Sequence, residues 1–321
     1  MKFRHNLPLS VFYPISAAKE SRKRLIFSFR CNIMQAMILA AGFGTRLRPY
    51  TLIRPKPLFP VCNVPLLHIL LDKLTALGCR NTVVNSHHLA EQIAAAVADR
   101  PEVILQHEAE VLGTGGGLRK ALPHFRSGPV LVMNGDIYHD LDLIGLLEAH
   151  KAGGCAVTLA LHDLLRFNTV RVRGGKVCGF GTAEPGEQLL AFTGIHVVER
   201  DVLAQIPAQG FFHIIDLYEK LAQAGQIGLV RVDGCFWQDI GTPADYLELH
   251  RRLLEGKHPA WAISSQARIG AGAVFADWGA VGPHAEIGAG AQLSRCVVWE
   301  NAAIPAGLHV KEQIICPAKP D

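Results

Sequence analysis

The order of hydrophobic and polar positions predicts alternating strands and helices from residue 34 onward. Short apolar runs are typical of buried strands and fall at Met37–Ala41, Thr82–Asn85, Val103–Gln106 and Val130–Met133. Helical patterns lie between these strands, at Pro65–Leu77, Leu89–Ala98 and Gly117–Leu122. Uninterrupted apolar strands separated by amphipathic helices indicate a parallel sheet that is covered on both faces.

The part of the chain that follows is richer in strands. These are predicted at Cys155–Leu161, Thr169–Val172, Lys176–Phe180 and Phe192–Val198. Two further helices are predicted near Ile214–Ala224 and Pro243–Leu254. We therefore expect one α/β domain over residues 34–256, built on a mixed, mostly parallel sheet.

Beyond Pro259 the pattern changes to a period of six. Apolar residues recur at Ile263, Ile269, Phe275, Val281, Ile287 and Leu293, and then, after a slip of one residue, at Val298, Ile304 and Val310. A period of six with glycine after the aliphatic residue is typical of a hexapeptide β-helix, whereas a Gly/Ala-rich linker has no reason to keep it. Residues 257–321 are therefore predicted to form a short left-handed parallel β-helix.

Composition excludes several other classes of protein. The net charge of +4 is small and is not gathered into a long run after the N-terminus, which disfavours a nucleic-acid partner. The sequence contains no uninterrupted apolar run of roughly 18 residues, so no membrane span is expected. The eight cysteines are scattered without a CxxC pair, which argues against a zinc site or a disulfide framework and favours the cytoplasm.

The first 33 residues differ from the rest. They have a basic start, an apolar centre broken by prolines and a second basic cluster. Small residues at 16–18 would suit a signal peptide, but the prolines favour a disordered extension, or a true start at Met34.

A glycine loop with two arginines, Gly42–Arg48, follows the first predicted strand. Glycines allow backbone N–H groups to approach an anion, and an arginine grips phosphate oxygens with a planar fork. The loop is neither a Walker loop nor a dinucleotide fingerprint, since Leu47 stands where the latter needs its third glycine. Lys56, between two prolines of restricted backbone, adds a second fixed positive charge.

The strings LAAGFGTRLRPYT and RPKPLFPV together resemble the signature of the sugar-1-phosphate nucleotidyltransferases. The resemblance continues through residues 111–117, 134–136, 192–195 and 237–243, in the order of that family. It implies a Rossmann-like nucleotidyltransferase domain. It also implies a reaction in which a sugar-1-phosphate attacks the α-phosphorus of a nucleoside triphosphate and pyrophosphate leaves.

The resemblance assigns Mg²⁺ to Asp136 and Asp239. Asp136 follows an apolar strand, so its carboxylate is expected at the carboxyl edge of the sheet, where open α/β sheets bind ligands. Asp239 could instead belong to a turn that leads into a helix capped by Thr242. Carboxylates, phosphates and water are suitable ligands for Mg²⁺.

The other roles are also carried over from the family. Arg46, Lys56 and Asp136 are the expected catalytic residues, while Asn134, Thr193 and Gly194 are expected to face the sugar phosphate. The nucleotide is expected to contact Leu39, Ala40, Ala41, Gly42, Gly44, Thr45, Arg46, Lys56, Gly113 and Gly115.

One position departs from the family. Many relatives carry a lysine that contacts the sugar phosphate where this chain has Glu184. Lys176, Arg171 or Arg173 would then have to replace that contact, or the sugar is held differently.

The strings GTGGG and VNSHHLAEQI resemble a branch of the family that uses GTP and mannose-1-phosphate or UTP and a muramic-acid sugar. The resemblance implies GTP and mannose-1-phosphate as substrates, with UTP or a thymidine nucleotide and another sugar as the alternatives. Two further alternatives are a non-catalytic regulatory paralogue and a bifunctional enzyme that uses His284 as an acyltransferase base. We also expect a homo-oligomer with no nucleic-acid or membrane partner.

Overall fold

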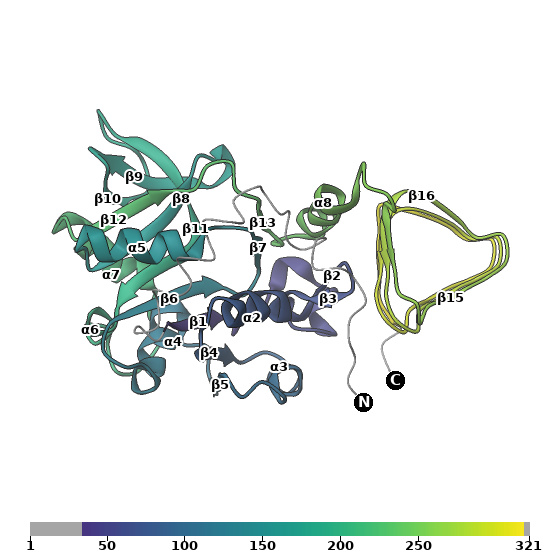
Figure 1. The fold of residues 1–321 in the computed structure, drawn as a ribbon, viewed down its shortest axis with the longest axis horizontal. Helices are drawn as coiled ribbons and strands as arrows, with labels where there is room; N and C mark the ends of the chain where they lie inside the picture. Colours follow the sequence, from purple (N-terminus) through teal and green to yellow (C-terminus); the bar gives the residue numbers. More distant parts are fainter. Residues whose placement is uncertain (1–33, 318–321) are drawn as a thin grey trace. The chain divides into compact units, whose positions relative to one another are not determined.

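The computed structural model describes residues 34–317 of the chain (Figure 1). The predictions made for the first 33 residues lie outside this range. Within it, a nine-stranded sheet has the strand order β5-β4-β1-β6-β11-β8-β12-β10-β9. The sheet belongs to the α/β part of the chain, and a separate set of short strands follows it.

The first four strands of this sheet are parallel. They are β1 (Gln35–Leu39), β4 (Asn81–Ser86), β5 (Val103–His107) and β6 (Pro129–Asn134). The helices α2 (Leu66–Ala76), α3 (Ala90–Val97) and α4 (Gly113–Ala121) lie between them in sequence. The alternation of strand and helix predicted from the apolar runs is confirmed.

In the second half, two strands run against the others. The strands are β8 (Val157–His162), β9 (Asn168–Arg173), β10 (Lys176–Phe180), β11 (Gln188–Glu199) and β12 (Ile227–Arg231). β11 pairs antiparallel with β6, β8 and β9, and β10 pairs antiparallel with β9 and β12. The sheet is therefore mixed, and most of its strands share one direction, as predicted.

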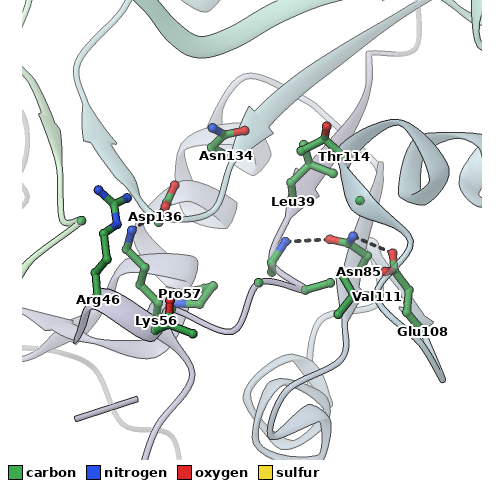
Figure 2. A pocket seen from close by; sticks show the side chains of 17 residues that line it. Leu39, Arg46, Lys56, Pro57, Asn85, Glu108, Val111, Thr114, Asn134 and Asp136 are labelled. Atoms are coloured by element: carbon green, nitrogen blue, oxygen red, sulfur yellow. Dashed lines mark hydrogen bonds and ion pairs between the residues drawn. The ribbon is translucent and has the colours of Figure 1, made fainter. Parts of the chain in front are cut away.

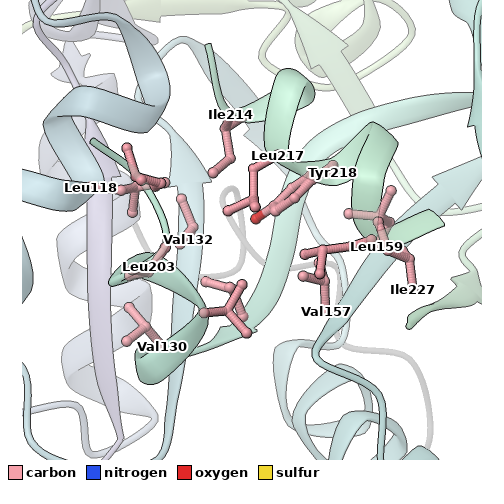
Figure 3. Close-up of a cluster of buried hydrophobic side chains, with 14 of the residues drawn as sticks. Leu118, Val130, Val132, Val157, Leu159, Leu203, Ile214, Leu217, Tyr218 and Ile227 are labelled. Carbon is pink, nitrogen blue, oxygen red and sulfur yellow. The ribbon is translucent and has the colours of Figure 1, made fainter. Parts of the chain in front are cut away.

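Helices cover both faces of the sheet. Along β8, Val157, Leu159 and Leu161 join a buried cluster with α4 and α7 (Ile214–Gln223), which Figure 3 shows around Tyr218. Thr158 points the other way, because successive side chains of a strand alternate between faces. It lies 2.9 Å from His150 of α5 (Leu143–Gly153), a helix that the sequence patterns above do not include.

Shorter elements complete the α/β part. They are the 3₁₀ turns η2 (Thr45–Leu47), η3 (Tyr50–Leu52), η4 (Lys56–Leu58), η5 (Leu122–His124) and η6 (Leu165–Phe167), the strands β2 (Pro60–Val61), β3 (Val64–Pro65), β7 (Ile137–His139) and β13 (Trp237–Asp239), and the helices α6 (Arg200–Leu203) and α8 (Pro243–Leu254). Thr242 caps α8 by accepting a hydrogen bond from the Asp245 N–H at 3.2 Å, as expected.

The helix predicted at Gly117–Leu122 begins earlier, at Gly113. Glycine disfavours helix, but tertiary contacts override that preference here. A Cβ on Gly115 would lie 2.6 Å from the ring of Phe212, and the Phe212 carbonyl accepts hydrogen bonds from the N–H groups of Gly115 and Gly116. Residues 113–117, part of the stretch that resembles the family, therefore begin α4, and their glycines permit close packing.

The C-terminal strand stack, as we name residues 261–315, consists of short parallel strands. They are β14 (Trp261–Ile263), β15 (Arg268–Ile269), β16 (Val274–Val281), β17 (Glu286–Ile287), β18 (Gln292–Val298), β19 (Ala303–Ile304), β20 (His309–Lys311) and β21 (Ile314–Ile315). Figure 1 shows the chain winding here as a three-sided coil. Trp261 pairs with Gly279, and Gly279 pairs in turn with Cys296. The second of these intervals is shorter than the first by a single position, which matches the slip in the apolar pattern.

The apolar residues of the period point into this stack. Val281, Ile287, Leu293, Val298, Ile304 and Val310 are all buried. Ile263 and Ile269, from the first coil, are 41% and 42% exposed, because no coil precedes them in the stack. Left-handed residues such as Gly272 and Gly290 mark the corners. His284, the candidate acyltransferase base, is exposed at such a corner, with a φ of 58°.

Within residues 34–317, no helix is long and apolar enough to cross a membrane.

Candidate functional site

A cavity of about 360 Å³ lies at the carboxyl ends of β1 and β6 (Figure 2). The two strands are in register there, since Leu39 pairs with Asn134, and the Gly135 N–H donates to the Leu39 carbonyl at 2.8 Å. The lining consists of Leu39, Ala40, Ala41, Gly42, Gly44, Thr45, Arg46, Lys56, Pro57, Asn85, Glu108, Val111, Gly113, Thr114, Asn134, Asp136 and Gly241. Most of the residues that the sequence singled out therefore meet around one cavity.

The backbone of the glycine loop Gly42–Arg48 takes a fixed turn beside this cavity and is accessible to a ligand. Gly44 has a φ of +60°, and a Cβ there would lie 2.8 Å from the Thr51 methyl group, so a side chain at this position would be strained. The Thr51 hydroxyl donates to the Gly44 carbonyl at 3.0 Å, which fixes the turn. A Cβ on Gly42 would meet nothing within 4 Å, so its backbone is open to a ligand.

Lys56 forms the cationic centre of one end of the cavity. Its Nζ lies 2.5 Å from Asp136 Oδ2 and 3.4 Å from Asp239 Oδ1, and only 9% of its side chain is exposed. The pairing of β7 with β13 sets Asp239 opposite Ile137, and so brings two aspartates from distant parts of the chain to one amine. Burial raises the pKa of Asp239 above its ordinary value; the positive charge of Lys56 opposes this shift, and the negative charge of Asp136 adds to it.

Asp239 belongs to a strand and does not cap α8, which removes the turn interpretation. A Cβ on Gly241 would lie 2.6 Å from Asp239 Oδ2 and 3.3 Å from Arg46 Nη2. The absence of a side chain at Gly241 therefore leaves room for the guanidinium beside the carboxylates. Arg46 and Lys56 supply two cationic side chains suited to phosphates at this end of the cavity.

The chemistry of the two aspartates fits Mg²⁺. Both carboxylates already face a common cation, the Lys56 amine. The described residues contain no cluster of three histidine, cysteine or acidic side chains that could enclose a metal by itself. Mg²⁺ is commonly held by one or two carboxylates together with substrate phosphates and water, and this pair suits that arrangement.

The opposite end of the cavity contains two residues that the sequence did not single out, Asn85 and Glu108 (Figure 2). Asn85 accepts a hydrogen bond from the Ala40 N–H at 2.6 Å and donates one to Glu108 Oε1 at 2.8 Å. Glu108 Oε2 accepts from the Leu112 N–H at 3.2 Å, and Glu108 is 1% exposed. The sequence could have revealed Asn85, because it is a polar residue near the carboxyl end of the buried strand TVVNS, where open α/β sheets bind ligands.

Four of the predicted site residues do not line the cavity: Gly115, Thr193, Gly194 and Asp239, the last of which contacts the lining residue Lys56. Gly115 packs against Phe212, and the buried Thr193 hydroxyl donates to the Ala160 carbonyl at 2.8 Å. Gly194, with a φ of 74°, lies behind Asn134, since a Cβ there would be 2.5 Å from the Asn134 amide nitrogen. In this structure Gly194 supports Asn134, which itself lines the cavity.

Of the three residues considered as replacements for the missing lysine, the two arginines pair with glutamates and Lys176 does not line the cavity. Arg171 lies 2.5 Å from Glu184 and 2.7 Å from Glu187, and Arg173 lies 3.3 Å from Glu187. Arg171 holds Glu187 so closely that the pKa of this carboxyl falls to about 2. Lys176, at the start of β10, is exposed and is not among the lining residues.

The nucleotidyl transferase family matches residues 35–256 of the chain. This chain belongs to that family. Two relatives of this nucleotidyl transferase are mannose-1-phosphate guanylyltransferase of Mycobacterium tuberculosis and N-acetylmuramate alpha-1-phosphate uridylyltransferase of Caulobacter vibrioides. Both are 29% identical; the first match covers 87% of this chain and 83% of the relative, the second 68% and 97%.

A solved structure shows the same fold. HddC from Yersinia pseudotuberculosis, complexed with GMP-PN, superimposes with a TM-score of 0.58 at 24% identity. The superposition covers 67% of this chain and 97% of HddC. With relatives that act on sugar-1-phosphates, the chain is an enzyme of the sugar-1-phosphate nucleotidyltransferase type.

Proposed function

We propose that the enzyme transfers a nucleoside monophosphate from GTP to mannose-1-phosphate in the presence of Mg²⁺, and releases pyrophosphate. The observation that carries this proposal is the opposite chemistry of the two ends of the cavity. One end holds Arg46, Lys56 and Asp136, and the other holds the buried acceptor Glu108. A nucleoside triphosphate has the matching polarity, with anionic phosphates at one end and hydrogen-bond donors on the base at the other.

The protein's own groups supply position and charge. The open backbone around Gly42 approaches the phosphates, and Arg46 and Lys56 neutralise the charge that grows on the leaving pyrophosphate. Bound Mg²⁺, held by Asp136 and Asp239, would polarise phosphate oxygens. The attacking sugar-1-phosphate oxygen is already an anion, so its alignment matters more than removal of a proton.

Glu108 favours guanine over uracil. An ionised glutamate is an acceptor only, and guanine presents neighbouring N–H donors on its N1 and N2 atoms. Uracil presents a single N–H donor between two carbonyl oxygens, which a carboxylate repels. The guanylyltransferase from Mycobacterium tuberculosis supports the same choice by similarity, whereas the uridylyltransferase from Caulobacter vibrioides keeps UTP as the alternative.

The test is a matrix of nucleoside triphosphates against sugar-1-phosphates, with detection of pyrophosphate. We expect GTP with mannose-1-phosphate to give the highest kcat/KM. Glu108→Gln, which adds an amide donor, should lower kcat/KM for GTP by roughly tenfold or more, because a charge-assisted hydrogen bond contributes roughly 1.5–3 kcal/mol. A wild-type preference for UTP would contradict the guanine assignment, and no pyrophosphate from any pair would contradict the reaction.

We also propose that the C-terminal strand stack is a hexapeptide left-handed parallel β-helix. Its three-sided coil and the parallel pairing of each of its longer strands with the next support this assignment. We further propose that the enzyme is a cytoplasmic homo-oligomer, for which sedimentation of the purified protein is the direct test of assembly.

A further inference from the structure

Trp299, which directly follows β18 of the C-terminal strand stack, is buried against the segment that carries Lys56. Its side chain is fully buried. Its ring lies edge-on to Phe59, with centroids 4.8 Å apart at 69°, and 6.1 Å from the ring of Tyr50. The Arg54 guanidinium lies over the same ring, 4.6 Å from its centroid. Residues on both sides of Lys56 therefore contact a single indole.

The next residue, Glu300, fixes the same segment by charge. Arg54 Nη1 donates to Glu300 Oε2 at 3.0 Å, and Arg54 Nη2 contacts Glu300 Oε1. The two side chains are only 17% and 30% exposed, so solvent screens this pair less than an open surface pair. A carboxylate held by two nitrogens of a planar guanidinium sets orientation as well as distance.

A hydrogen-bond chain adds a third connection. The Trp299 indole N–H donates to the Tyr246 hydroxyl at 3.2 Å, and this hydroxyl donates to the Pro60 carbonyl. Tyr246 belongs to α8 and is fully buried. The backbone just after η4 is thereby tied to the same indole.

The other side of this segment faces the cavity. Thr51 donates to the Gly44 carbonyl of the glycine loop, and Lys56 reaches Asp136 and Asp239. Only Pro55 separates Arg54 from Lys56, and its ring fixes φ, so a displacement of Arg54 is passed on to Lys56. Positioning errors of about 1 Å can reduce catalysis by roughly 100-fold.

We propose that Trp299 and Glu300 are positioning residues for nucleotide binding, acting through Arg54 and Phe59 on Lys56 and the glycine loop. The C-terminal strand stack then contributes to nucleotide binding, because two of its residues position Lys56 and the glycine loop. This inference rests on the proposed function, because it requires that Lys56 meets the triphosphate.

The test compares Glu300→Ala and Trp299→Phe with a matched control, Glu286→Ala. Glu286 pairs with Arg268 at 2.6 Å in the same stack, but both side chains are well exposed. All proteins are assayed well below their melting midpoints. We expect the KM for the nucleoside triphosphate to rise roughly five- to thirty-fold in Glu300→Ala, which corresponds to a coupling of roughly 1–2 kcal/mol. The KM for sugar-1-phosphate should change less than twofold, and Trp299→Phe should give a smaller change of the same kind.

A second measurement does not depend on turnover. Brief acetylation with acetic anhydride, read by mass spectrometry, reports the exposure of Lys56, which is 8% exposed in the intact protein. Acetylation of Lys56 should increase at least threefold in Glu300→Ala and stay unchanged in Glu286→Ala. Equal labelling and an equal nucleotide KM in the two variants would overturn the positioning role. An inactive wild-type protein that still shows the labelling difference would instead reject the proposed reaction.

Discussion

Asn85 links the Ala40 backbone to the Glu108 carboxylate, and an aspartate in its place should make the stability of the protein depend on pH. Asn85→Asp keeps the acceptor for the Ala40 N–H at 2.6 Å. It replaces the amide that donates to Glu108 at 2.8 Å with a second carboxylate. Both residues are nearly inaccessible to solvent, so two charges at this distance are strongly disfavoured and the folded pair keeps one proton.

The retained proton determines how much folding stability the variant loses and how that loss depends on pH. Holding it on a carboxyl with an ordinary pKa of about 4 costs roughly 1.4 kcal/mol for each pH unit above that value. The variant should therefore be less stable than the wild type by about 4 kcal/mol at pH 7 and by about 1.4 kcal/mol at pH 5. The pKa of the pair is raised by folding, so the stability of the variant relative to the wild type is lost as the pH rises.

Denaturant unfolding of both proteins at pH 5, 6 and 7 measures this difference. Asn85→Leu serves as the control, because it removes both hydrogen bonds without adding a second carboxylate, and its deficit should rise with pH less steeply than that of Asn85→Asp. A deficit of Asn85→Asp that stays constant over this range would refute the shared proton. The KM for the nucleoside triphosphate should also rise in Asn85→Leu, because this variant removes the acceptor for the Ala40 N–H and Ala40 lines the cavity.

Three further predictions concern the other end of the cavity. Asp136→Ala should abolish Mg²⁺-dependent pyrophosphate release without a change in the circular dichroism spectrum; full activity would remove Asp136 from the mechanism. Without Mg²⁺, Asp239→Asn should melt at a higher temperature than the wild type at pH 7 and at the same temperature below pH 4. The reason is that folding raises the pKa of Asp239, so that the folded state disfavours the ionised carboxylate. A lower melting midpoint of the variant at pH 7 would contradict this. Gly44→Ala should lose roughly 1–3 kcal/mol of stability through left-handed strain and the contact with the Thr51 methyl group, and Thr51→Ser should restore part of it in denaturant unfolding; no restoration would show that the methyl contact is harmless.

Most strands of the sheet were predictable because short runs of apolar residues mark them, whereas β12 was not predicted. The slip in the period of six was also readable, and it reappears in the shortened interval between the paired residues Gly279 and Cys296. The helical start at Gly113 was not predictable, since glycine lowers helix propensity and only the contact with Phe212 compensates for it. Tertiary packing of this kind leaves no local pattern.

The half of the site with Arg46 and Lys56 was easier to predict than the half with Asn85 and Glu108. Arg46, Lys56 and Asp136 are charged residues in short, distinctive strings, and all three line the cavity. Asn85 and Glu108 act as a pair only because β4 and β5 are neighbours in the sheet, and Glu108 alone looks like an ordinary acidic residue after a strand. Pairing between strands that are distant in sequence is what a single sequence does not reveal.

Extra coils can be added to the C-terminal strand stack without moving Trp299 only at its C-terminal end. Each coil pairs with its immediate neighbours, so a duplication of the codons for one coil would add a layer of roughly 4.8 Å without disturbing the others. A layer inserted before Trp299 would move this residue away from Phe59 by that height, whereas layers appended after Ile315 leave it in place. Descendants of this gene with longer tails should therefore have gained them at the C-terminal end.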